Sequence, residues 1–444
     1  MFRKNGLLVL FLTIGPLLLW SQTNISGVIN DYAQVQAIEE GCQTILTLDN
    51  ANAFQATDKV LLLQMQGAEI AESDNASFGE ISDPASTGSY ETNEIDAIDG
   101  NQVYLKYQLI NSYQLTGQLQ LVRIPVLDNA IVTDTLKVAP WDGQKGGVLA
   151  LEVTGLLELN APIIANGAGF RGAIAQLNLP NDCNWFFQNN DYFYNQNSWR
   201  AAKKGEGIAA LIGGKEAGRG PQANGGGGGN DHNAGGGGGA NRSRGGQGGT
   251  NEEPTTFGCK GRFPGVGGRA LSDFGEQRIF LGGGGGAGHG NNADQTDGGN
   301  GGGIILLIAG ELRSNAFAIQ ADGRAAPVAN GDGGGGGGAG GSVILDIGQL
   351  LDPAQITALG GLGARTINPS NRCMGPGGGG SGGHLLLDVG NEALLTVDLS
   401  GGAPGLSVNS SVCAEGTNGA SSGEMGLQED LLGIPQGPLN DGGL

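Results

Sequence analysis

Short apolar runs alternate with glycine along most of this chain. Four runs share one layout, a glycine pair followed by an almost unbroken aliphatic stretch that closes on glycine, at residues 146–156, 302–310, 340–348 and 382–390. Nearly continuous aliphatic runs are typical of parallel strands that are covered on both faces. The last three recur at intervals of about 40 residues, a spacing typical of stacked supersecondary units. The pattern therefore predicts a right-handed parallel β-helix or a flattened solenoid.

Residues 24–140 follow a different pattern. Residues 44–48 alternate apolar and polar side chains with the period of a half-buried strand, and residues 59–65 form a buried-strand run. Asp99-Gly100 is the residue pair that a tight primed hairpin turn requires. Short strands with turn signals and little helical periodicity predict a small β-barrel or sandwich.

Glycine supplies 88 of the 444 residues, without the Gly-X-Y period of collagen. Ordering glycine costs more backbone entropy than ordering any other residue. Its runs are therefore either flexible linkers or extended threefold helices that pack side by side through backbone hydrogen bonds. We favour polyglycine-II-type loops of the second kind, because the runs adjoin strands and contain little serine or proline. The longest runs occupy residues 225–229, 235–239, 282–286 and 333–338.

The predicted organisation is all-β, with two structured parts. A signal peptide at 1–21 precedes a small β domain at 24–140. A glycine-rich β-solenoid follows at 141–430, with an insertion at 173–300, and a tail occupies 431–444.

The N-terminus has the layout of a secretory signal peptide. Arg3 and Lys4 precede an apolar stretch at 7–19 that a glycine and a proline interrupt. This stretch is too short and too broken for a comfortable membrane span, and no later segment is long enough. We expect cleavage after Ser21 and an exported chain without a transmembrane span.

Acidic residues outnumber basic ones, 43 to 23, and the net charge is −20. Nucleic acid is excluded as a partner, because phosphate binding requires lysine and arginine. The charge suits solubility outside the cell. Calcium is the alternative use of these carboxylates, but Asp322 and Asp332 are too scattered for the repeated ligand ladder of a calcium-binding β-roll. The sequence therefore predicts no cofactor.

Two aspartates in the repeated runs deserve comparison with glycan-cleaving enzymes. Asp346 and Asp388 occupy equivalent positions in the third and fourth runs, so stacking would bring them together. Most glycoside hydrolases use such a carboxylate pair, which makes a β-helical polysaccharide lyase or hydrolase the alternative function. We favour a solvated ladder at the edge of a turn, because no basic neighbour is evident.

The histidines and cysteines contain no metal or redox motif. His232, His289 and His384 lie far apart beside glycine and are interpreted as polar loop residues. Four cysteines lie in the glycine-rich part and allow three connectivities. Cys373 and Cys413 are placed first as a pair because they flank the fourth run. The remaining cysteine outside this part, Cys42, is expected to be free and buried.

One aromatic-dense segment lies near the start of the insertion. Aromatic faces among asparagine and glutamine suit stacking on sugar rings, and exposed aromatic clusters often mark binding sites. A small core that pins the insertion explains the same residues equally well. The candidate glycan-contact residues are Trp185, Phe187, Tyr192, Tyr194 and Trp199.

Several segments carry a resemblance to a known family. They lie at residues 58–67, 120–125, 141–143, 169–172, 204–209 and 281–289. Together with the four runs, they resemble the glycine-rich N-terminal region of gliding-motility-associated, type IX-secreted bacterial surface proteins of the adhesin kind. The resemblance implies a secreted or outer-surface protein and involves no catalytic motif. The predicted function is a non-catalytic structural or adhesion protein, whose partners are surface glycans or other envelope or matrix components.

Overall fold

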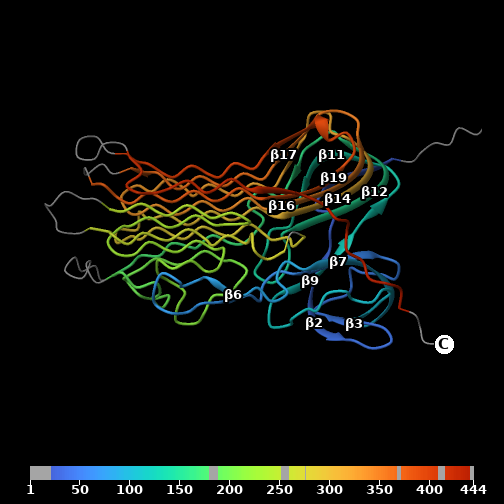
Figure 1. Ribbon diagram of the computed structural model, residues 1–444, viewed down its shortest axis with the longest axis horizontal. Coiled ribbons are helices and arrows are strands. Elements are labelled where there is room, and N and C mark those ends of the chain that lie inside the picture. Colours follow the sequence, from blue (N-terminus) through green and yellow to red (C-terminus); the bar gives the residue numbers. More distant parts are fainter. Residues whose placement is uncertain are drawn as a thin grey trace, which may run out of the picture.

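The computed structural model describes residues 22–179, 189–251, 260–275, 277–367, 372–408 and 416–440. It confirms the predicted all-β fold, with a small closed barrel and a large parallel sheet curled into a half-barrel that resembles a β-helix (Figure 1). Long glycine-rich loops run side by side away from the strands, to the left in Figure 1. Nowhere in these ranges is a helix long and apolar enough for a membrane crossing.

The N-terminal barrel is antiparallel and closed. Its strands are β2 (Tyr32–Glu39), β3 (Ile45–Leu48), β4 (Lys59–Gln64), β7 (Tyr90–Asp99), β8 (Gln102–Leu105) and β9 (Leu119–Ile124). They close in the order β2-β3-β8-β7-β4-β9. Alternate residues such as Leu46, Leu48, Val60 and Leu62 point into the core, as the two apolar patterns predicted. Gly100 adopts φ 59° between β7 and β8, which confirms the predicted hairpin.

The large sheet is parallel and has 12 strands. They are β1 (Thr23–Gly27), β10 (Val126–Leu127), β11 (Ala130–Lys137), β12 (Val148–Leu159), β13 (Ile163–Ile164), β14 (Ile304–Arg313), β15 (Ala318–Gln320), β16 (Ser342–Leu350), β17 (Ala354–Thr357), β19 (His384–Val389), β20 (Leu395–Asp398) and β22 (Leu427–Asp430). The order is β20-β17-β15-β13-β11-β12-β14-β16-β19-β22, with β1 beside β11 and β10 beside β12. Each turn of the chain adds one strand to each limb, as in a solenoid.

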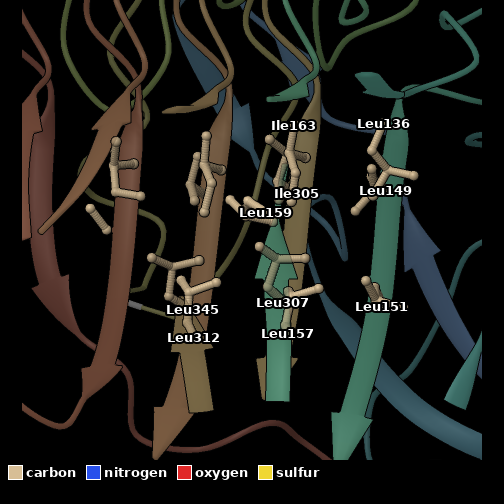
Figure 2. Close-up of a cluster of buried hydrophobic side chains, with 14 of the residues drawn as sticks. Leu136, Leu149, Leu151, Leu157, Leu159, Ile163, Ile305, Leu307, Leu312 and Leu345 are labelled. Atoms are coloured by element: carbon tan, nitrogen blue, oxygen red, sulfur yellow. The ribbon is translucent and has the colours of Figure 1, made fainter. Parts of the chain in front are cut away.

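The four repeated runs supply β12, β14, β16 and β19, which lie next to one another in register. Both faces of these strands are covered, which explains why the runs are continuous rather than alternating. Leu149 and Leu151 point into the curled sheet with Ile305 and Leu307 (Figure 2). The intervening residues, such as Ala150, pack against the barrel and the bases of the loops.

The strands before residue 140 are divided between the two parts of the fold. β10 and β11 pair with β12, and β1 pairs with β11, all in parallel. The N-terminal region therefore supplies the first turn of the solenoid as well as the barrel. A parallel partner far away in the chain leaves no local signal, so strand periodicity alone does not separate these two roles.

Smaller elements decorate the two sheets. β5 (Glu69–Ile70) pairs with β6 (Ile81–Asp83), and β18 (Thr366–Ile367) pairs with β21 (Ser407–Val408). A 3-10 turn, η2 (Glu392–Leu394), precedes β20.

The glycine-rich loops form an ordered block of extended segments. Successive N–H groups of residues 235–240 donate in rotation to three neighbouring segments, at 245–249, 333–338 and 224–229, over 2.8–2.9 Å. A repeat of three residues is that of the polyproline II helix. The bonding therefore confirms polyglycine-II-type loops, packed side by side, over flexible linkers.

Close approach on the remaining sides requires glycine. A Cβ added to Gly236, Gly237 or Gly238 would lie 2.2, 2.3 or 2.0 Å from a carbonyl oxygen of yet another segment. No side chain fits at such distances. We call the loop segments between residues 165 and 426 the glycine block. In this block, backbone hydrogen bonds between neighbouring segments of the chain take the place of a side-chain core.

The tail returns from the last solenoid turn to the barrel. Leu431 is buried against the solenoid. The Thr92 N–H donates to the Pro435 oxygen at 2.8 Å, and the Gln108 N–H donates to the Pro438 oxygen at 2.9 Å. The tail therefore links the last turn of the solenoid to the first domain of the chain.

Candidate functional site

The aromatic segment lies partly outside the described residues, which exclude Trp185 and Phe187. Tyr192, Tyr194 and Trp199 are half-buried. The Arg219 guanidinium lies 5.1 Å from the ring centre of Tyr192, and that of Arg200 lies 5.4 Å from the Trp199 ring. These rings therefore contact cations of the chain itself.

Backbone contacts hold the same segment in place. The Tyr192 N–H donates to Asp74 Oδ1 at 2.6 Å, and the Tyr194 N–H donates to the Ala217 oxygen at 2.9 Å. Phe193 packs on Phe78 with ring centres 5.5 Å apart. This packing is what a small core pinning the insertion would show, while contact of the three half-buried rings with glycans stays a prediction.

Sequence analysis missed the cation beneath this segment. Lys204 is 2% exposed, and its Nζ lies 3.6 Å from the ring centre of Phe78 without a hydrogen-bond partner. Burial lowers the pKa of Lys204 well below its ordinary value, and the charge of Lys215 lowers it further. The sequence shows adjacent lysines in a glycine-rich segment, and nothing in it distinguishes the buried Lys204 from the half-exposed Lys203.

The two aspartates of the repeated runs do lie side by side. Asp346 on β16 is directly opposite Asp388 on β19, and Glu152 on β12 lies in the same row beyond Ile308. Burial raises the pKa of Asp346, as do the charges of Asp388 and Glu152. A basic neighbour, which the sequence did not reveal, is present: Lys59 of the barrel forms an ion pair with Glu152.

Three hollows that the described residues form lie elsewhere. One of about 480 Å³ is lined by turns of the glycine block, one of about 670 Å³ lies near Gly155, and one of about 630 Å³ lies near Tyr90. Neither Asp346 nor Asp388 lines any of the three.

The interpretation of the histidines as polar loop residues is confirmed for His232 and His289, which lie in a turn and a loop, and is wrong for His384. His384 begins β19 and is fully buried, and its Nε2 lies 2.7 Å from Glu429 Oε2. His232 and His289 end glycine segments but are 2% and 0% exposed. Close packing of polar backbone leaves these rings no route to solvent, so they serve as hydrogen-bonding groups inside the block.

His289 shows how a buried ring is satisfied. Its Nε2 lies 2.8 Å from the Trp199 oxygen, and its Nδ1 accepts from the Asn233 N–H at 3.2 Å. These partners fix the neutral tautomer with the proton on Nε2. Burial lowers the pKa of His289 to about 4 and that of His232 to about 3.

The cysteine predictions are resolved in part. Cys373 is disulfide-bonded. Cys413 lies outside the described residues, so its pairing with Cys373 stays a prediction. Cys42 is free, as expected, but it is exposed rather than buried, because it lies in the turn between β2 and β3.

The part of the chain that the structure describes contains no cluster of side chains that could hold a metal ion. No three histidine, cysteine, aspartate or glutamate side chains there gather closely enough to hold an ion. Asp332 instead caps a turn, accepting from the N–H groups of Asn292 and Asp294 at 2.9 and 3.1 Å.

No protein-family model matches the chain, and no curated protein matches it. Among solved structures, the tailspike protein gp49 from Pseudomonas phage LKA1 aligns with 85% of this chain and 48% of the tailspike chain, at 8% sequence identity and a TM-score of 0.17. The alignment thus spans about half of the tailspike. A TM-score this low carries no argument about fold or function.

Proposed function

We propose that this chain is an exported structural or adhesion protein of a bacterial surface or matrix, and that it is not an enzyme. The observation that carries the proposal is the glycine block, an ordered body held by backbone hydrogen bonds between segments. Such a body offers stiffness and an extended surface but few side chains for chemistry.

Four further features support an extracellular role. A disulfide at Cys373 forms and persists in oxidising compartments. The net charge of −20 keeps a glycine-rich surface soluble. The N-terminal sequence has the layout of a signal peptide, and the resemblance to gliding-motility-associated surface proteins points the same way. Glycans or other envelope components remain the partners that we propose.

Cell fractionation tests the proposal. We expect the protein in the medium or on the outer surface, where protease added to intact cells degrades it while a cytoplasmic marker enzyme stays intact. Deletion of the coding sequence should then weaken attachment of the cells to glycan-coated surfaces. Recovery of the protein from the cytoplasm alone would overturn the proposal.

The row of Asp346 and Asp388 is the specific observation that favours a second candidate, a glycan-cleaving enzyme. Incubation with a panel of polysaccharides would then release new reducing ends or unsaturated uronates. A true activity should disappear in Asp346→Asn and persist in Asp322→Asn, an aspartate away from the row. Under the main proposal, neither the native protein nor the control variant releases product.

A further inference from the structure

The hollow of about 480 Å³ lies where three parts of the fold meet. The turns at residues 242–244 and 269–274, which connect segments of the glycine block, form one side. Residues of β6 and of the segment that leads into β22 form the others. We call this hollow the junction cavity. Its volume falls in the range of small-ligand sites, which occur preferentially at such junctions.

Three arginines converge on the junction cavity, Arg242, Arg244 and Arg269. The side chain of Arg242 is fully buried. Its Nη1 donates to the Leu271 oxygen and its Nη2 to Glu429 Oε2, both at 2.9 Å, while its Nε–H has no partner. With no exposed surface, this guanidinium is a fixed part of the wall, and its Nε–H does not reach the open cavity.

The guanidinium groups of the other two arginines differ in how firmly they are held. Arg269 is held by the Ala76 and Phe78 oxygens at 2.7 and 2.9 Å, and its Nε–H also lacks a partner. Arg244 is exposed, and only its backbone is held, by Glu424. The cavity therefore has two arginines fixed in its wall and one adaptable donor, Arg244, at its rim.

Acceptors and an apolar surface complete the lining. Glu80, Asp273 and Glu424 line the same cavity beside the three arginines, of which Arg242 is already paired with Glu429. Phe274 is half-buried and lies among them. A mixed set of donors and acceptors suits a ligand whose groups both donate and accept, while a bare anion or cation would meet repulsion from part of the lining.

We propose that the junction cavity binds a neutral oligosaccharide. Sugar hydroxyls donate to the carboxylates and accept from the Arg244 guanidinium, and the C–H face of a pyranose ring packs on Phe274. The inference rests on the proposed function in one respect, since it supplies the glycan contact of an adhesion protein. It places that contact away from the aromatic segment, which is occupied by the chain's own cations.

The site is ordered before a ligand arrives. Glu429 accepts from both Arg242 and His384, at 2.9 and 2.7 Å, so the buried arginine is fixed from behind by the last two solenoid strands. A wall that is fixed in this way reduces the ordering cost of binding. A ligand in the cavity would also bridge the solenoid, the glycine block and the β6 region.

Calorimetric titration of the purified chain tests the proposal. The probes are short neutral oligosaccharides of cellulose, mannan, laminarin and chitin, each at up to about 10 mM, with an oligogalacturonate as the charged comparison. We expect at least one neutral probe to bind. Arg244→Ala and Phe274→Ala should each weaken that binding about tenfold, the cost of losing a polar contact or a stacked ring. Arg365→Ala, at an exposed arginine that does not line the cavity, should leave it unchanged.

Other outcomes overturn the proposal. Failure of every neutral probe to bind, or preference for the oligogalacturonate, would remove the assigned ligand class. Loss of binding in Trp199→Ala with full binding in Arg244→Ala would place glycan recognition at the aromatic segment instead. None of these results bears on cell fractionation, so failure of this inference and failure of the proposed function are distinguishable.

Discussion

Glycine at single positions of the glycine block is required by what surrounds it rather than by its own backbone angles. Gly237 has no positive φ, yet a Cβ there would lie 2.3 Å from the Val266 oxygen. Its N–H donates to the Gly227 oxygen at 2.8 Å, so the segment cannot shift without losing its bonds. At this position, the missing Cβ allows the backbone segments to approach closely enough to keep their hydrogen bonds.

Gly237→Ala should therefore be strongly destabilising. We expect the unfolding free energy to fall by about 3 kcal/mol or more, because the neighbour is backbone and cannot rotate away. Gly213→Ala is the matched control, since no atom lies within 4 Å of the added carbon. Urea unfolding measures both, and equal midpoints for the two variants would contradict a packed glycine block.

The buried Lys204 side chain lowers the stability of the fold. Replacing it with methionine should raise the unfolding free energy by about 1–3 kcal/mol at neutral pH, because an unpaired buried amine is removed. The attraction to the Phe78 ring, at most about 2 kcal/mol for a charged amine, is smaller than the cost of burying that charge.

The pH dependence of Lys204→Met provides the check. Burial lowers the folded-state pKa, so between that value and the ordinary lysine value the unfolded chain binds more protons. Native stability therefore rises with pH through this window, and the advantage of the variant should shrink as the pH approaches about 10.4. Lys203→Met, next in the chain but half-exposed, should show no such trend.

Among the elements, the strands were predictable and the ends of the glycine segments were not. The runs that form β12, β14, β16 and β19 could be identified as strands from their sequence, because a strand covered on both faces requires a continuous apolar run. The juxtaposition of Asp346 and Asp388 followed from repeat spacing alone, while Lys59 comes from another domain and had no sequence signal. The arginines of the junction cavity lie in turns whose neighbours are set only by the packing of the whole block.

The buried histidines at the ends of glycine segments should make the protein sensitive to acid. His232 and His289 have folded-state pKa values lowered by burial to about 3 and about 4, against an ordinary 6.5. Below pH 6.5 these two histidines therefore become protonated in the unfolded chain but stay neutral in the folded chain. The free energy of unfolding falls as the pH falls. By pH 4.5 each ring should cost about 2–3 kcal/mol.

Urea unfolding as a function of pH measures this effect. Glu429, whose pKa is held at about 2 by His384, loses its contribution only below 4.5. Asp322, Asp332 and Asp346, whose pKa values are raised by burial, contribute a slope of the opposite sign, so the difference between the native chain and a histidine variant is what reports the histidine. His289→Gln should flatten the slope between pH 6.5 and 4.5, whatever its effect at neutral pH. An unchanged slope would mean that His289 is protonated in the folded state.

At the scale of the whole molecule, the barrel, the curled sheet and the glycine block form a continuous body through shared surfaces. One apolar cluster contains barrel residues such as Leu61, sheet residues such as Ile304 and loop residues such as Phe280. The tail adds a second connection, because it leaves the last solenoid turn and bonds to the first domain. Unfolding of the barrel should therefore be coupled to that of the solenoid.

The tail connection can be broken at one position. A Cβ on Gly437 would lie 1.8 Å from the Gln108 oxygen, so Gly437→Val should detach the tail from the barrel. We expect faster hydrogen exchange at the Gln108 N–H, which donates to Pro438, and a loss of about 1–3 kcal/mol. Leu432→Ser, in the same tail but 76% exposed, is the control and should change neither quantity. If exchange at Gln108 is as slow in Gly437→Val as in the native chain, the tail does not hold the barrel.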